Sequence, residues 1–212
     1  MTAARAAPFT VGESISFGWD GFKANFGPLA VVAFVVWGVE FLLNLLIRPD
    51  TGTGLLVAQV LYFVLGSIIA MGWITISLEV VDGRTVEISD VWKHIDKLGA
   101  CILAAVLFGL MFTIGLVLLI VPGILVAVTF ALYGFCILDH NLGAIEGLKR
   151  SADITRGYRG QLFLFGLALI GLNILGLLLL IIGVLVTSGI SLIAAGYVYR
   201  KLDAASSGAG VG

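Results

Sequence analysis

Long apolar segments alternate with short polar ones along this chain. A helix that crosses a bilayer needs about 20 predominantly apolar residues. Segments at or near this length are predicted as six transmembrane spans: 26–47, 55–79, 99–120, 123–139, 160–181 and 184–201. The pattern therefore predicts an all-α integral membrane protein, with one transmembrane domain over residues 1–203 and a disordered tail at 204–212.

Two uncharged stretches, 98–138 and 160–199, are too long for one crossing, so each is predicted to contain two spans. In the first stretch Pro122-Gly123 is the predicted point of reversal, because proline lacks an N–H donor and glycine tolerates a turn. In the second stretch the reversal is predicted near Gly183.

Three shorter amphipathic segments, at 11–25, 89–97 and 141–156, are predicted as helices lying in the membrane interface. Each one precedes two spans. The predicted architecture is therefore three transmembrane hairpins, each preceded by an interfacial helix on the cytoplasmic side. The pattern repeats in its architecture, whereas residue identity between the units is too low to establish a duplication.

The first amphipathic segment begins at a capping box formed by Thr10 and Glu13. Its apolar side chains recur at helical spacing: Ile15, Trp19, Phe22 and Phe26. In the third segment Asn141 is the predicted cap. Its apolar face is predicted to comprise Ile145, Leu148 and Ala152. These faces are expected to rest at the level of the lipid headgroups.

The composition excludes an ordinary soluble domain. Hydrophobic residues make up 60% of the 212 residues and charged residues 12%, whereas soluble domains carry about 25% charge. The mean hydropathy is +1.13. The net charge of −1 gives no reason to expect a nucleic-acid partner.

The distribution of charge predicts the orientation. With six spans, one side of the membrane carries nearly all the basic residues: Arg5, Lys23, Arg84, Lys93, Lys97, Lys149, Arg150, Arg156, Arg159, Arg200 and Lys201. The other side carries Arg48. By the positive-inside rule both termini are cytoplasmic, in a prokaryotic cytoplasmic membrane. The N-terminal segment MTAARAAPFT lacks an apolar core, so no cleaved signal peptide is expected.

Glu40 is the ionisable residue well inside a predicted span, and Asn44 follows it by one helical turn. A carboxylate in hydrocarbon costs at least about 2.5–3.5 kcal/mol, so it should face protein or water. One interpretation is a proton or cation site shared with Gln59 and Asn173. The other places Glu40 near the outer surface or in a pair within the bundle, with Gln59 and Asn173 as interhelical hydrogen-bond partners.

The sequence lacks signatures of enzymes. There is no His-Glu-x-x-His motif and no Gly-x-Ser-x-Gly turn. The two cysteines, Cys101 and Cys136, lie in apolar spans and are predicted as unpaired core residues. They have no metal-ligand spacing with the two histidines, His94 and His140. No catalytic residue, cofactor or metal is therefore predicted.

Basic residues cluster between the fourth and fifth predicted spans: Lys149, Arg150, Arg156 and Arg159. Such a cluster attracts anionic headgroups, by about 1 kcal/mol for each basic residue near the surface. The alternative is that these residues only determine topology. The two interpretations are compatible, and contact with anionic lipid is the prediction.

The stretch 115–165 contains the motifs Val-Pro-Gly-Ile at 121–124, an acidic exit at Asp139, Leu-Lys-Arg-Ser at 148–151 and Thr-Arg-Gly at 155–157. On these motifs it resembles a class of bacterial and archaeal multi-pass proteins that includes YciC-like inner-membrane proteins. The membrane domain fused to some glycerophosphoryl diester phosphodiesterases belongs to the same class. The resemblance implies an all-helical membrane fold. The phosphodiesterase's soluble domain is missing here, so that activity is not implied.

Two functions follow as hypotheses. The first is a non-enzymatic membrane scaffold or accessory component that contacts anionic lipids and either protein partners or further copies of itself. The second is a small transporter or channel that uses Glu40, Asn44, Gln59 and Asn173.

Overall fold

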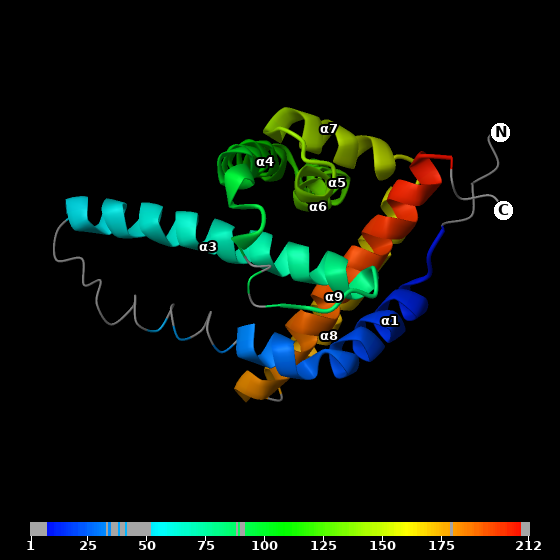
Figure 1. Cartoon of the computed structure of the whole chain (residues 1–212). Coiled ribbons are helices and arrows are strands. Elements are labelled where there is room, and N and C mark those ends of the chain that lie inside the picture. The colour runs from blue at the N-terminus through cyan, green and yellow to red at the C-terminus, as the bar shows by residue number, and fades with distance from the viewer. Residues whose placement is uncertain are drawn as a thin grey trace, which may run out of the picture.

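The computed structural model describes residues 8–32, 34, 38, 41, 52–87, 89, 92–178 and 180–208. This part of the chain is all-α, as predicted, and contains eight labelled α-helices and one 3₁₀-helix (Figure 1). By length and composition, five helical segments are candidate membrane spans: Gly54–Val81, Ile95–Leu118, Ile120–Asp139, Arg159–Leu178 and Gly183–Ser206. The described residues thus do not form six spans arranged as three hairpins. Much of the first predicted span, 26–47, lies outside them.

Helix α3 (Gly52–Val81) is the longest described helix, with 30 residues. At 1.5 Å per residue it is about 45 Å long, which exceeds the hydrocarbon thickness of about 30 Å. Its first half projects from the remainder of the bundle (Figure 1). Near its C-terminal end, residues 75–80 are all buried, and Ile76 and Ser77 are 0% exposed.

The first well-defined hairpin joins α4 (Leu98–Leu118) to α5 (Ile120–Thr129). The reversal occurs at Leu119, which has an extended backbone. The predicted reversal at Pro122-Gly123 is therefore displaced: Pro122 lies in the first turn of α5, where a missing N–H donor costs nothing. Gly123 packs on α4, since a Cβ there would lie 2.5 Å from Leu116 Cδ2.

After α5 a turn at residues 130–132 interrupts the helix, and the chain continues as α6 (Tyr133–Asp139). Asn141, predicted as a helix cap, instead has a left-handed backbone with φ of 55°. Helix α7 (Ala144–Ile154) begins after Gly143. Its buried face is not the predicted one, because Leu148 is buried but Ile145 is 52% exposed.

The second hairpin joins α8 (Arg159–Leu178) to α9 (Leu180–Ser206). The reversal therefore precedes Gly183, which lies inside α9. The two helices approach closely at Gly176, where a Cβ would lie 2.8 Å from the carbonyl oxygen of Gly183. Helix α9 continues to Ser206, so the first residues of the predicted tail, 204–206, are helical.

The N-terminal helix α1 (Val11–Ala24) packs along α9 rather than lying alone in the interface. Its packed face contains small residues: Ser14 is 0% exposed, and a Cβ on Gly18 would lie 2.5 Å from the carbonyl oxygen of Ile190. Trp19 and Phe26, on the predicted apolar face, remain 46% and 56% exposed. The hydroxyl of Thr10 accepts a hydrogen bond from the Glu13 N–H, as the capping box predicts.

The second predicted interfacial helix, 89–97, is not an α-helix in its described residues. They contain the 3₁₀-helix η2 (Ile95–Lys97), which leads directly into α4. Trp92 and Ile95 stay exposed, so this segment lacks the buried face that stabilises α1 and α7.

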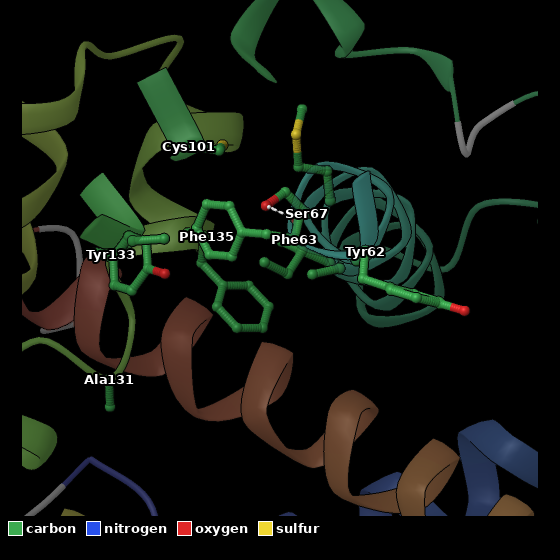
Figure 2. Close-up of a pocket in the computed structure, with 13 residues that line it drawn as sticks. Tyr62, Phe63, Ser67, Cys101, Ala131, Tyr133 and Phe135 are labelled. Atoms are coloured by element: carbon green, nitrogen blue, oxygen red, sulfur yellow. Dashed lines mark hydrogen bonds between the residues drawn. The ribbon is translucent and has the colours of Figure 1, made fainter. Parts of the chain in front are cut away.

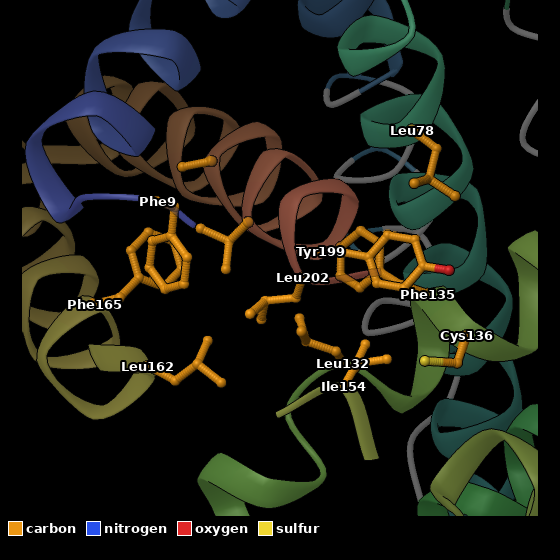
Figure 3. Packing of buried hydrophobic residues seen from close by; sticks show 12 residues of the cluster. Phe9, Leu78, Leu132, Phe135, Cys136, Ile154, Leu162, Phe165, Tyr199 and Leu202 are labelled. Atoms are coloured by element: carbon orange, nitrogen blue, oxygen red, sulfur yellow. The ribbon is translucent and has the colours of Figure 1, made fainter. Parts of the chain in front are cut away.

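One apolar core joins Phe9, which precedes α1, to α6, α8 and α9 (Figure 3). Phe9 contacts Phe165 of α8 edge to face, at 6.1 Å between ring centroids. Tyr199 of α9 stacks beside Phe135 of α6 at 5.3 Å. This core positions the helix ends that carry the charged residues.

Candidate functional site

Charged side chains join the ends of three helices. Arg200 of α9 donates hydrogen bonds to both carboxylate oxygens of Asp82, at 2.9 and 2.7 Å, and to Asp139 Oδ2 at 2.6 Å. The Tyr199 hydroxyl donates to the same Asp139 oxygen at 2.8 Å. Asp82 follows α3 and Asp139 ends α6, so one guanidinium group connects α3, α6 and α9.

A second ion pair connects α7 to α9. Arg150 donates to Asp203 Oδ1 at 2.7 Å and also to the hydroxyl oxygens of Ser206 and Ser207. The other oxygen of Asp203 lies 3.1 Å from His140 Nε2. Arg150 is one of the four basic residues predicted to contact lipid, and its charge is paired with Asp203 in the C-terminal part of α9.

Asp139, His140 and Asp203 bring three potential metal-ligand atoms within 4.8 Å of one another. Both carboxylates are already neutralised by guanidinium groups, of Arg200 and Arg150 respectively. A divalent cation would have to compete with these ion pairs. We therefore assign the cluster to helix pairing.

Among the described residues, three exposed basic side chains differ from most of the other basic ones in having no ion-pair partner. Ion pairs engage most of the remainder: Lys23, Arg84, Lys93, Arg150, Arg200 and Lys201. Lys97 donates to the carbonyl oxygen of Asn141. Within the described part of the chain, Lys149, Arg156 and Arg159 form no ion pair and are exposed. These three residues are called the basic corner below.

The position of the basic corner depends on how α7 is anchored. The break after α5 leaves backbone groups of Thr129 and Leu132 without helical partners. The hydroxyls of Ser151 and Thr155 both donate to the Thr129 carbonyl oxygen at 3.1 Å, and Ser151 Oγ accepts from the Leu132 N–H. In hydrocarbon such groups need an internal partner. The buried face of α7 thereby fixes its basic face outward.

A sharp turn then leads from α7 into α8. Gly157 has φ of 90°, a left-handed conformation that glycine adopts without strain. Arg156 lies in this turn and Arg159 is the first residue of α8. The turn therefore places both guanidinium groups at the entry of a candidate membrane span.

An apolar groove of about 480 Å³ lies between the α4–α5 hairpin and α8. Its α8 wall begins at Leu162, one turn after Arg159. All the residues that line the groove are uncharged. This volume is within the range of about 300–1,000 Å³ found for ligand pockets.

A second cavity, of about 430 Å³, lies between α3, α4 and α6 (Figure 2). Tyr62, Phe63 and Ser67 of α3 line it together with Tyr133 and Phe135. The ring of Tyr62 points away from Tyr133 and Phe135 (Figure 2). The Ser67 hydroxyl donates to the Phe63 carbonyl oxygen at 2.8 Å, so its polarity is satisfied within α3. No charged side chain lines this cavity among the described residues.

The predicted intramembrane polar site is only partly described. Glu40 and Asn44 lie outside the described residues. Gln59 is exposed on the first half of α3. Asn173 donates to Ser191 Oγ at 2.8 Å and thereby joins α8 to α9. Asn173 acts here as the interhelical hydrogen-bond partner that the second interpretation of this residue predicts.

The two cysteines are buried free thiols, as predicted. The contacts of Arg200 with Asp82 and Asp139 were not predicted from the sequence. The available signal was that all three residues flank predicted spans on the same side of the membrane. The roles of Ser151 and Thr155 were not predicted either, although their spacing of four places both hydroxyls on one helical face.

Comparison with known proteins finds only distant similarity. The chain is 23% identical, over 238 aligned residues, to a protein described as uncharacterised from Mycobacterium bovis. A protein from Mycobacterium tuberculosis with the same kind of description is similar to the same extent. In both cases the alignment covers 95% of this chain and 71% of the relative. No protein-family model matches the chain, and no solved structure matches it.

Proposed function

We propose that this multi-pass membrane protein is a non-enzymatic scaffold or accessory component that holds anionic lipid headgroups at its basic corner. One observation carries the proposal. Lys149, Arg156 and Arg159 are exposed and form no ion pair within the described chain, whereas the other described basic residues, apart from Lys97, do. Side chains used only for folding would be expected to join the ion pairs that surround them.

The proposal includes an orientation. The ends of α3, α6 and α9, which share the Arg200 network, lie with the basic corner on the cytoplasmic face of a prokaryotic membrane. The bias of lysine and arginine toward this end supports that assignment. The resemblance of residues 115–165 to the YciC-like class, whose proteins are mostly uncharacterised, agrees with a membrane component that lacks a known reaction.

Native mass spectrometry of the protein released from nanodiscs tests the proposal. Nanodiscs containing equal amounts of phosphatidylglycerol and phosphatidylcholine should yield protein that retains mainly phosphatidylglycerol. The triple variant Lys149→Gln, Arg156→Gln, Arg159→Gln should lose this preference, by about tenfold or more, because each basic residue contributes about 1 kcal/mol.

A matched control removes three basic residues that already form ion pairs: Lys23→Gln, Arg84→Gln and Lys201→Gln. It changes the net charge by the same amount and should keep the preference for phosphatidylglycerol. Equal loss in both triple variants would show a general charge effect and contradict the proposal. Equal retention in both would contradict it as well.

A further inference from the structure

The apolar groove and the basic corner are continuous along one face of α8. Arg159, Phe163, Gly166 and Ile170 follow one another at helical spacing, so they lie on the same side of the helix. The last three line the groove. The first is an exposed cation without an ion pair in the described chain. This face therefore changes from charged to apolar within one turn.

The length of this face matches one leaflet. Arg159 and Ile170 are eleven positions apart on α8. At 1.5 Å per residue this corresponds to about 17 Å, roughly half of a hydrocarbon core of about 30 Å. An occupant that reaches the guanidinium of Arg159 and fills the groove must therefore be amphipathic and about one leaflet long.

The walls of the groove are wholly apolar. Three phenylalanines, Phe112 of α4 and Phe163 and Phe165 of α8, line it together with aliphatic side chains from both hairpins. Its remaining lining residues are Leu116, Ile124, Ala127, Val128, Ala131, Leu132, Leu162, Gly166, Leu167, Leu169, Ile170 and Ala195. With no hydrogen-bonding side chain on its walls, the groove suits a hydrocarbon chain and disfavours a polar solute.

The charged end favours a phosphate. Arg156 and Arg159 present two guanidinium groups, whose paired N–H donors match phosphate oxygens. Lys149 is flanked by Glu146 and Asp153 on α7, which reduces the positive charge there. The two arginines are therefore the better candidates for direct contact with a headgroup.

We infer that the groove between α4, α5 and α8 is a binding site for one anionic phospholipid of the inner leaflet. Its phosphate lies against Arg156 and Arg159, and one acyl chain fills the groove as far as Ile170. This inference rests on the proposed function and adds to it a defined position for the acyl chain.

Two glycines of α8 provide a matched pair of variants. A Cβ at Gly166 would meet no heavy atom within 4 Å, so Gly166→Phe places an aromatic ring in the open groove. Gly171 has equally open surroundings and does not line the groove. Gly171→Phe thus makes the same chemical change on the same helix, on another face.

The experiment uses phosphatidylglycerol with a photoreactive diazirine near the end of its acyl chain, in nanodiscs. Labelled residues are located by peptide mass spectrometry. Wild type and Gly171→Phe should be labelled mainly on the lining residues of α4, α5 and α8. Gly166→Phe should lose this labelling by about fivefold or more, the loss expected when a fitted chain is displaced. Phosphatidylcholine with the same diazirine should label the groove weakly.

Other outcomes would overturn the inference. Equal labelling of Gly166→Phe and Gly171→Phe, or labelling spread evenly over the exposed half of α3, would show that no chain occupies the groove. Equal labelling by phosphatidylcholine would show that any bulk lipid enters it. In these cases, retained preference for phosphatidylglycerol in native mass spectrometry would leave the proposed function intact. The proposed function would instead be rejected if the basic-corner triple variant kept the wild-type preference for phosphatidylglycerol, or if the ion-paired control variant lost it equally.

Discussion

Arg150 Nη2 lies 2.7 Å from Asp203 Oδ1, and this ion pair separates Arg150 from its basic neighbours. The side chain of Arg150 is 30% exposed and that of Asp203 14%. Four basic residues were predicted from the sequence to contact lipid, and one of them, Arg150, connects α7 to α9 through this ion pair. Its neighbour Lys149 points outward and has no such partner in the described chain.

We expect Arg150→Gln to lower the stability of the protein without changing its lipid preference. Loss of the hydrogen bonds to Asp203, Ser206 and Ser207 should cost roughly 1–2 kcal/mol, since the pair is partly exposed. Lys149→Gln should leave stability within about 0.5 kcal/mol of wild type. Thermal unfolding in micelles and phosphatidylglycerol retention provide the two measurements. A loss of lipid preference in Arg150→Gln at unchanged stability would contradict this assignment.

Arg200→Gln should destabilise the protein by about 2–3 kcal/mol. The substitution removes hydrogen bonds to Asp82 and Asp139 and leaves the carboxylate of Asp139, whose side chain is 16% exposed, without its guanidinium partner. Arg200→Lys should recover only part of the loss, because an ammonium group cannot match both carboxylates as a planar guanidinium does.

Arg84→Gln is the control for that series. Arg84 also bonds to Asp82, at 2.7 Å, but its side chain is 55% exposed. Surface pairs of this kind contribute about 0–1 kcal/mol. Denaturation midpoints in one detergent compare all three variants. Equal losses in Arg84→Gln and Arg200→Gln would show that the helix ends are not joined through Arg200.

The sequence pattern predicted the positions of the candidate spans better than it predicted the contacts between helices. Charge-free stretches are long enough to identify α3, α4, α8 and α9, because only helices of that composition suit a bilayer. The reversal near residues 119–123 was displaced because proline is tolerated in the first turn of a helix as well as in a turn. Local sequence does not distinguish these two uses.

The contacts between helices were the part that sequence did not predict. The apolar face of α1 suggested a helix in the interface, but Gly18 permits close approach to the backbone of α9 at Ile190. The basic corner was identified as a cluster by its charge. Arg150 does not belong to the basic corner because it pairs with Asp203. Asp203 is distant in sequence and becomes a neighbour only through the packing of α7 on α9.

The close approach of α1 to α9 gives a further prediction. Gly18→Ala should destabilise the protein by about 1–3 kcal/mol, since the added Cβ would lie 2.5 Å from the Ile190 carbonyl oxygen and a backbone must shift. Gly12→Ala is the control on the same helix. A Cβ there meets nothing within 4 Å, so the change should be neutral or stabilising by up to about 0.5 kcal/mol. Thermal unfolding distinguishes them, and equal effects would show that α1 does not dock on α9 at Gly18.

His94 should make the stability of the protein depend on pH. Its Nδ1 lies 3.2 Å from Thr75 Oγ1, whose hydroxyl donates to the Met71 carbonyl oxygen. Burial lowers the pKa of His94, and the charge of Lys93 lowers it further, while Asp96 opposes the shift. The unfolded chain therefore binds a proton more readily than the folded one.

The stabilisation due to neutral His94 is consequently complete above its ordinary pKa of 6.5 and is lost as pH falls below that value toward the lower folded pKa. The thermal midpoint of wild type should decrease between pH 7.5 and 5.5. In His94→Gln this part of the decrease should be absent, because glutamine does not titrate. His140→Gln removes the other histidine, and this variant should still show the decrease in thermal midpoint. A decrease that persists unchanged in His94→Gln would contradict the assignment of this pH dependence to His94.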